Sequence, residues 1–351
     1  MVRNAAALSA GAVLMAAMAV AAGEAAPPPA QGGQVILSES SYWRLLPVWR
    51  APMVRTDKGL EEFKRESSSY ASAFVAFSEP PPAEWVGPDF PDREWERWRL
   101  DPKRRREVDY GFRQFGAFSP TLAVQCLRGR FRVEDPAGVR GLALSLAYRG
   151  GVVAYLNGKE IARGSLPKEG KIEPLTLAED YPAEAFTTPG TQRGSNLILA
   201  EFGHPATFKD RVEKRIRRLP AVAVKPEDLR KGVNVLALEF HRAPYLGSKG
   251  LEIEGMNHES VWSTCGLVSL ELRADAGAEP NTSRPRGLQV WNSSVMERLG
   301  PTEYGDPCEP LGPVVIPAAR QGRFTGKVAV TSDQAIKGLQ AEAGELVHQD
   351  G

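Results

Sequence analysis

Two side chains able to move a proton, Glu239 and His241, stand two positions apart in the apolar run LALEFHR. On a strand, residues at i and i+2 face the same side, so the two could form an acid–base dyad. No nucleophile accompanies them, and an ion pair with an arginine of a neighbouring strand is the more ordinary use of such a glutamate. Cys126 and the four histidines lack the spacing typical of zinc or of a Cys–His pair. We therefore predict no catalytic residue, no metal site and no cofactor.

A glycosidase would need two carboxylates that face each other across a sugar. The chain has 43 acidic residues, but none stands in a recognisable setting at the end of a barrel strand. An enzyme whose catalytic groups all lie in this chain is therefore the least favoured class of function. Whether a longer parent protein is a glycoside hydrolase stays open.

Sugar binding is a second chemistry that the residues could support. The segment 242–261 offers an aromatic ring for stacking and polar groups that can hydrogen-bond hydroxyls. Alternatively, its rings only plug the end of a core. We expect any glycan bound at such a shallow site to have an affinity of about millimolar strength. The predicted carbohydrate-binding residues are Tyr245, Arg242, Asn257, His258 and, as a second ring, Trp98.

The elements that must position these residues are strands. Residues 141–164, GLALSLAYRGGVVAYLNGKEIARG, hold three short apolar runs separated by Gly150-Gly151 and Asn157-Gly158. Both dipeptides are typical of two-residue hairpin loops, which need positive φ at their central residues. This pattern predicts an antiparallel meander inside a sheet, with Asn157 and Gly158 both at positive φ.

Further strands are predicted at 122–133, 233–240 and 263–273, where apolar and polar residues alternate. In the last of these, Val268, Leu270 and Leu272 are expected to point inward. Residues 208–218 are a plausible short helix. The chain from 35 to 276 is therefore predicted to be one all-β antiparallel β-sandwich, and its predicted buried positions include Leu144, Val153, Tyr155, Leu236, Leu238 and Leu270.

Three segments carry a resemblance to a known family. WVGPDFPDREW (85–95), VVAYLNGKEIAR (152–163) and DLRKGVNVLALEFHR (228–242) resemble galactose-binding-like jelly-roll domains, although Pro91 and Arg93-Glu94 depart from the usual residues. Such domains occur as sugar-binding or accessory modules beside the catalytic domains of glycoside hydrolases. The resemblance implies that the first segment folds back over the sandwich, with Trp85 and Trp95 capping the core.

The N-terminus has the pattern of a secretory signal peptide. A charged start precedes an Ala-rich apolar run, and Ala19-Val20-Ala21 fits a cleavage site. We assign 1–26 to the signal peptide and 27–34 to a spacer, which predicts a secreted or periplasmic protein. An uncleaved membrane anchor is the alternative. No later segment has the roughly 20 apolar residues of a membrane span, so no span is expected after cleavage.

The net charge of +1 favours neither nucleic acid nor an anionic membrane as a partner.

The C-terminal region is predicted to have two parts. Residues 277–320 are interpreted as a Pro-rich linker or a strap along the surface. Residues 321–351 read as the start of a second, truncated β domain, because FTGKVAVT (324–331) has the composition of a strand. A downstream domain of the same polypeptide is therefore an expected partner.

Two main functions remain open. The first is a secreted, non-catalytic carbohydrate-binding or accessory β-sandwich of a larger protein similar to a glycoside hydrolase. The second is a purely structural sandwich that orients a catalytic domain missing from this chain. An aromatic ring exposed at a loop end would favour the first, and burial of every loop tryptophan would favour the second.

Overall fold

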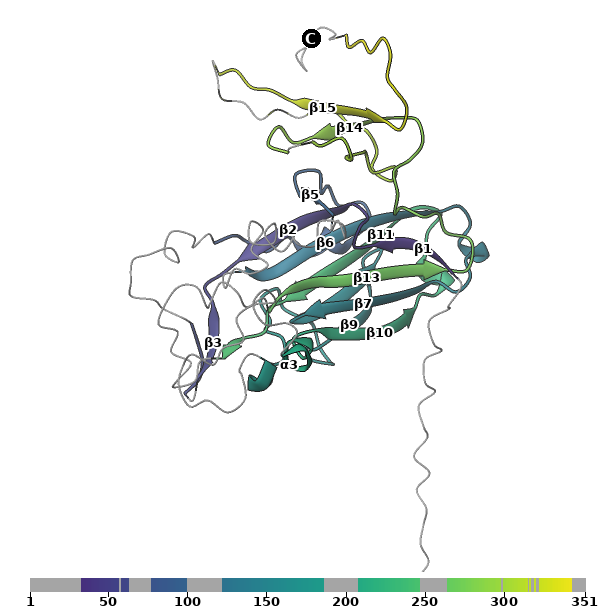
Figure 1. Cartoon of the computed structure of the whole chain (residues 1–351). Helices are drawn as coiled ribbons and strands as arrows, with labels where there is room; N and C mark the ends of the chain where they lie inside the picture. The colour runs from purple at the N-terminus through teal and green to yellow at the C-terminus, as the bar shows by residue number, and fades with distance from the viewer. Residues whose placement is uncertain are drawn as a thin grey trace, which may run out of the picture.

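The computed structural model describes residues 33–56, 58–62, 77–99, 122–185, 208–246, 264–297, 299–314, 316, 319 and 322–342. Two antiparallel sheets pack face to face in this part of the chain, and a smaller pair of strands lies above them in the view of Figure 1. The prediction of an all-β sandwich is therefore confirmed. No helix in the described ranges is long and apolar enough to cross a membrane.

The first main sheet has four strands in the order β1-β13-β7-β10. They are β1 (Gln34–Ser38), β13 (Gly266–Ala274), β7 (Ala143–Arg149) and β10 (Arg217–Ala223). The second sheet has six strands in the order β5-β2-β6-β11-β8-β9. They are β5 (Glu96–Trp98), β2 (Trp43–Trp49), β6 (Leu122–Val133), β11 (Gly232–His241), β8 (Gly151–Leu156) and β9 (Lys159–Gly164).

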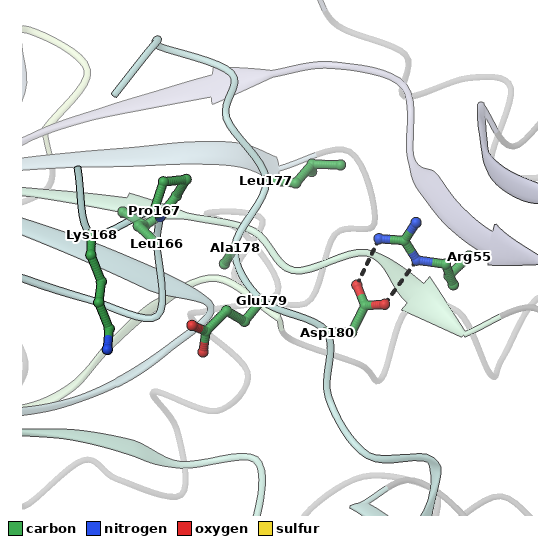
Figure 2. Close-up of a pocket in the computed structure, with 8 residues that line it drawn as sticks. All are labelled: Arg55, Leu166, Pro167, Lys168, Leu177, Ala178, Glu179 and Asp180. Atoms are coloured by element: carbon green, nitrogen blue, oxygen red, sulfur yellow. Dashed lines mark hydrogen bonds and ion pairs between the residues drawn. The ribbon is translucent and has the colours of Figure 1, made fainter. Parts of the chain in front are cut away.

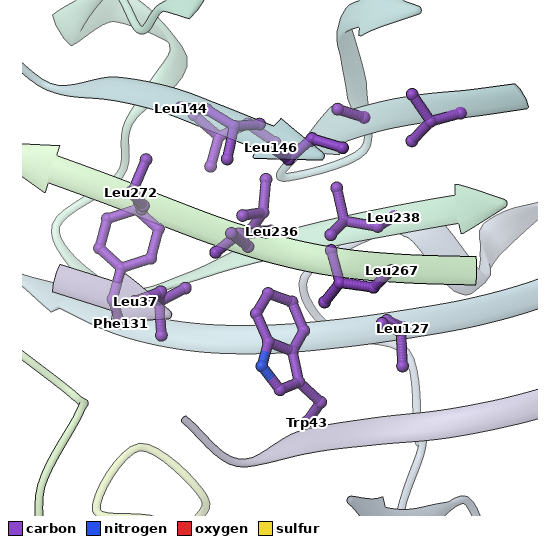
Figure 3. Packing of buried hydrophobic residues seen from close by; sticks show 14 of the residues in the cluster. Leu37, Trp43, Leu127, Phe131, Leu144, Leu146, Leu236, Leu238, Leu267 and Leu272 are labelled. Atoms are coloured by element: carbon purple, nitrogen blue, oxygen red, sulfur yellow. The ribbon is translucent and has the colours of Figure 1, made fainter. Parts of the chain in front are cut away.

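Apolar side chains of the two facing sheets form the main core (Figure 3). Leu236, Leu238 and Phe240 of β11 point into it, as the alternation in the sequence predicts. Five of the six positions predicted to be buried are buried, namely Leu144, Val153, Leu236, Leu238 and Leu270. Tyr155 is the exception. It is only half-buried and packs in the clusters on the outer side of the six-stranded sheet.

The Asn157-Gly158 turn is confirmed. These residues have φ of 51° and 91° and join β8 to β9 as a two-residue loop. The Asn157 side chain also links the turn to β11, because its Nδ2 donates to Asn234 Oδ1 at 2.8 Å and its Oδ1 accepts from the Val235 N–H at 3.0 Å. The turn is therefore attached to the neighbouring strand by side-chain hydrogen bonds.

The predicted meander is wrong at Gly150. β7 pairs with β13 and β10, whereas β8 pairs with β11 and β9, so the chain passes from one sheet to the other between them. Gly150 has a φ of 80°, and a β-carbon there would overlap the carbonyl oxygens of His241 and Thr264. Gly150-Gly151 therefore forms a tight corner, the turn at which the chain crosses from the four-stranded sheet to the six-stranded sheet.

Two other expectations are corrected. A bulge between Leu267 and Ser269 shifts the alternation in β13, so that Leu267 is buried and Val268 is only half-buried. The predicted helix at 208–218 is shorter: α3 spans Lys209–Glu213, and β10 begins at Arg217.

Two smaller sheets complete the described fold. The first has the order β12-β3-β4, with β12 (Tyr245–Leu246) parallel to β3 (Met53–Thr56) and β4 (Gly59–Glu62) antiparallel to it. The second pairs β14 (Leu288–Ser293) with β15 (Lys327–Ser332). β14 thus lies within the segment read as a linker. Single 3-10 turns occur at Ala83–Val86, Pro136–Gly138, Ala183–Ala185 and Pro226–Asp228.

We predict that Gly150→Ala destabilises the protein far more than Gly170→Ala. Both glycines have φ near 80°, but no atom lies within 4 Å of a β-carbon on Gly170. Strain at positive φ alone costs roughly 1–2 kcal/mol, and Gly150→Ala adds overlap with two backbone carbonyls. Urea unfolding of both variants measures the difference, and equal losses would contradict the corner described above.

Candidate functional site

Three arginines form a row across the outer face of the six-stranded sheet. The register places Arg97 of β5 opposite Arg44 of β2, and Arg44 opposite Arg128 of β6. Arg130 lies two residues further along β6 and therefore faces the same side. Arg44 and Arg130 are buried, and Arg128 is 0% exposed. Like charges on adjacent strands repel each other, so this arginine row, with Arg130 beside it, requires carboxylates from outside the sheet.

One carboxylate comes from residues 85–95, the covering segment, which packs on this face of the sheet. Asp92 accepts hydrogen bonds from Arg128 Nε at 2.6 Å and from Arg130 Nη2 at 2.5 and 2.6 Å. Burial acts to raise the pKa of Asp92, but Arg130 and Arg128 outweigh it and hold the pKa below its usual value. Arg128 also donates to the carbonyl oxygens of Trp85 and Gly87. The covering segment is therefore attached by both its acid and its backbone.

Trp85 and Trp95 lie in the same segment and are buried, with ring centroids 5.6 Å apart. They pack against Cys126 and Ala237 on the outer face of the sheet, away from the core between the two sheets. Residues 85–95 thus fold back over the sandwich as a second apolar layer.

More carboxylates come from residues 297–309, which lead from β14 towards β15. Glu309 accepts from Arg44 Nε and Nη2 at 2.7 and 2.6 Å, and from Arg130 Nη1 at 3.2 Å. Glu297 pairs with Arg97 at 3.3 Å. This segment therefore docks on the arginine row from the side opposite the sheet.

Aromatic rings extend the contact to β14. The guanidinium carbon of Arg97 lies 4.1 Å from the ring centroid of Tyr42 and 5.4 Å from that of Trp291 in β14. Tyr42 and Tyr304 meet edge to face at 4.9 Å. Arg97 Nη2 also donates to the Tyr304 carbonyl at 2.8 Å. The site is thus an internal docking surface that holds the β14–β15 pair against the sandwich.

One buried carboxyl group at this surface has a raised pKa. Burial, together with the nearby Glu309, raises the pKa of Asp306 to about 6. Its Oδ1 accepts from Asn281 Nδ2 at 2.8 Å and from the Cys308 N–H at 2.9 Å. Asp306 therefore favours the protonated form more than an exposed carboxyl does.

The residues predicted to bind sugar are placed as follows. Trp98 is buried in the main core, and Arg242 is buried and donates to the Ala51 carbonyl at 2.5 Å. The backbone of Tyr245 forms β12 beside Val54 of β3. Asn257 and His258 lie outside the described residues. The structure thus places Trp98 in the core and Arg242 beside the backbone of Ala51, and binding by the loop stays a prediction.

Glu239 and His241 do face the same side of β11, as predicted. His241 Nε2 lies 3.4 Å from Glu239 Oε1, and the Tyr155 hydroxyl donates to Glu239 Oε2 at 3.3 Å. Within the described part of the chain, the contacts of the Glu239 carboxylate are with Tyr155 and His241, and an arginine partner stays a prediction. His241 is fully buried and its Nδ1 lies 2.8 Å from the Thr176 carbonyl oxygen, so this group ties the segment around Thr176 to the sheet.

The three cysteines are free and buried. Within the described ranges, no group of three or more His, Cys, Asp or Glu side chains could hold a metal ion.

The arginine row was not predicted from the sequence. The alternation in 122–133 correctly places Arg130 on the outer face, but outward charged residues of a strand are usually solvated. Only the number of arginines on adjacent outer positions could have suggested a covered face, and the register that brings Arg44 beside Arg128 is not visible in the sequence.

Comparison with known proteins identifies no family: no family model and no curated protein matches this chain. Among solved structures, β-glucuronidase 2 of Bacteroides uniformis matches at 13% identity and a TM-score of 0.30, over 75% of this chain and 20% of that one. A glycosyl hydrolase family 2 member of Bacteroides cellulosilyticus matches at 12% identity and 0.27, over 74% and 23%. At these values the likeness assigns neither a family nor an activity to this chain.

We predict that Asp92→Asn costs about 3–5 kcal/mol, because it leaves Arg128 and Arg130 buried without their shared carboxylate. Asp89→Asn in the same segment is the control, since the Asp89 side chain is exposed in its pair with Arg230. Urea unfolding should show little change for the control. Similar losses in the two variants would mean that the buried ion pairs do not hold the segment.

The raised pKa of Asp306 should be visible in how the free energy of unfolding depends on pH. The pKa of Asp306 in the folded protein lies above its ordinary value. The contribution of Asp306 to the free energy of unfolding is therefore fully present below about pH 4 and is lost as the pH rises through about 6. Asp306→Asn keeps an acceptor for Asn281 and Cys308 but removes the charge. We expect the variant to be more stable than the parent by roughly 2–3 kcal/mol at pH 7 and equal to it near pH 4. A difference that stayed constant in urea unfolding between those pH values would contradict this assignment.

Proposed function

We propose that this chain is a non-catalytic accessory module in which the β-sandwich is a platform that fixes the position of the β14–β15 pair. The observation that carries the proposal is the insertion of Glu309 between Arg44 and Arg130, with Glu297 on Arg97 beside it. A flexible linker would not bury its carboxylates in this way. The proposal therefore favours a structural, orienting role.

The environment of the tryptophans supports the same role. Five of the six tryptophans in the described ranges are buried: Trp43, Trp85, Trp95, Trp98 and Trp291. Trp85 and Trp95 lie in a segment where an exposed ring could have stacked on a sugar. Both rings are instead buried against the outer face of the six-stranded sheet. This is the arrangement expected of a structural module.

The wider context of the module is also proposed. The resemblance of segments 85–95, 152–163 and 228–242 to galactose-binding-like jelly-roll domains supports a place beside a catalytic domain of a glycoside hydrolase. The pattern of residues 1–26 supports secretion or a periplasmic location. In this proposal the catalytic groups belong to a downstream domain of the same polypeptide, which the β14–β15 pair would help to orient.

Hydrogen exchange of Glu309→Gln tests the platform role. Losing the charge that faces Arg44 and Arg130 should speed exchange of the Trp291 and Ala329 amides by at least about tenfold, while β6 and β11 stay protected. Glu279→Gln is the matched control, because Glu279 pairs with Arg132 of β6 at 3.8 Å but is exposed.

Exchange in β14 and β15 that matched the parent would overturn the platform role. Faster exchange in every strand would also contradict it, since the sandwich itself would then depend on Glu309. Only selective loosening of β14 and β15 supports the proposal.

A further inference from the structure

Two titratable side chains lie on the outer face of β11, away from the arginine row. His241 is fully buried, and Glu239, two residues earlier on the same face, is 8% exposed. Neither residue belongs to the arginine row or to the segment 297–309, so the platform role does not account for them. Titratable groups are costly to bury unless their charges and hydrogen bonds are satisfied.

The contacts of His241 determine which of its ring nitrogens carries a proton. Nδ1 lies 2.8 Å from the carbonyl oxygen of Thr176. Because a carbonyl oxygen can only accept a hydrogen bond, Nδ1 must be protonated and donate to it. In a neutral imidazole, Nε2 would then be the unprotonated nitrogen and could only accept.

The second ring nitrogen faces another acceptor. Nε2 of His241 lies 3.4 Å from Oε1 of Glu239, and it is buried without a hydrogen-bond partner in the described part of the chain. Two lone pairs that face each other inside a protein are unfavourable, whereas a proton on Nε2 makes the same contact an attraction between opposite charges. An imidazole nitrogen is more basic than a carboxylate, so a proton between the two belongs on the ring.

The neighbouring strands bring neutral groups to Glu239. The hydroxyl of Tyr155 in β8 donates to its Oε2 at 3.3 Å, and burial together with the charge of Glu239 raises the pKa of this tyrosine, so the hydroxyl remains a donor. Burial and the same charge also raise the pKa of the Cys126 thiol in β6. In β9, Arg163 pairs with Glu160 at 2.5 and 2.7 Å. The described cation next to the Glu239 carboxylate is therefore a protonated His241.

The segment 165–180 brings a backbone group to the ring. Its contribution is the Thr176 carbonyl, and the carboxylate of Asp180 in the same segment pairs with Arg55 of β3 (Figure 2). Arg242, the residue after His241, donates its guanidinium protons to the Ala51 carbonyl at 2.5 Å. These charged side chains thus have partners of their own.

We propose that His241 is an imidazolium paired with Glu239, and that its Nε2 proton makes the attachment of Thr176 dependent on pH. When that proton is lost, the ring and the carboxylate repel each other and the ring turns away from the Thr176 carbonyl. The effect should reach Ala178, whose N–H donates at 2.9 Å to the carbonyl of Arg242, next to His241. The attachment is therefore strongest at low pH and weakens as the pH rises.

Nitrogen NMR of the isotope-labelled full chain tests the proposal. At about pH 6, the two ring nitrogens of His241 should have the nearly equal shifts of an imidazolium. As the pH is raised to about 10, the ring should become neutral. The backbone amide signals of Thr176 and Ala178 should change along the same titration curve, because the ring holds this segment.

Glu239→Gln separates the charge from the contact. The amide nitrogen of the variant can donate to Nε2 and its amide oxygen can accept from Tyr155, so the contact is retained without a carboxylate. We expect a neutral ring with a protonated Nδ1 already at about pH 6, and no joint titration with Thr176. Glu271→Gln is the matched control and should titrate like the parent, since Glu271 pairs with Arg273 on the sandwich surface.

Three outcomes would overturn the proposal. The first is a neutral His241 ring in the parent at about pH 6. The second is a ring that titrates while the Thr176 and Ala178 signals stay constant. The third is a Glu239→Gln variant that titrates like the parent, because the ring proton would then not depend on the carboxylate. The state of the ring in the parent decides the proposal even where a variant folds poorly.

Discussion

Three arginines side by side on one face of a sheet impose the main constraint on this molecule. Arg97, Arg44 and Arg128 are neighbours across three strands, and their guanidinium groups are removed from most solvent. Burying such charges without partners would cost several kcal/mol each. The face therefore has to be covered by segments that bring carboxylates, and Asp92 and Glu309 meet this requirement from two different parts of the chain. The positions of the covering segment and of β14–β15 follow from that need.

The opposite face of the same strands meets a different requirement. Trp43 of β2 points into the main core and lies across from Gly129 of β6, where a β-carbon would come within 2.6 Å of the indole ring. The glycine gives the ring its space, while Arg128 and Arg130 on either side of it point outward. Strand β6 thus contributes to an apolar core on one face and to an ion-pair network on the other, and alternation from Cys126 to Val133 keeps the two apart.

Local patterns in the sequence predict the strands and the sandwich, because alternation and turn residues act over a few positions. They predict the Asn157-Gly158 turn for the same reason. They fail at Gly150, where the partner of β7 is β13, more than 100 residues later in the chain. They also fail at Arg44, whose acidic partner Glu309 is 265 residues away. Such contacts depend on the register of the whole sheet, which no local pattern contains.

Two Arg–Asp pairs with similar distances show how burial decides what an ion pair contributes to stability. Arg128 and Asp92 are 0% and 4% exposed, and both are needed to neutralise a covered face. Arg55 and Asp180 are 42% and 40% exposed, and the backbone around Asp180 is held by Arg217 and by strand-like hydrogen bonds that do not involve the Asp180 carboxylate. An exposed pair of this kind adds little to stability. The backbone hydrogen bonds, and not this exposed ion pair, therefore hold the segment around Asp180 in place.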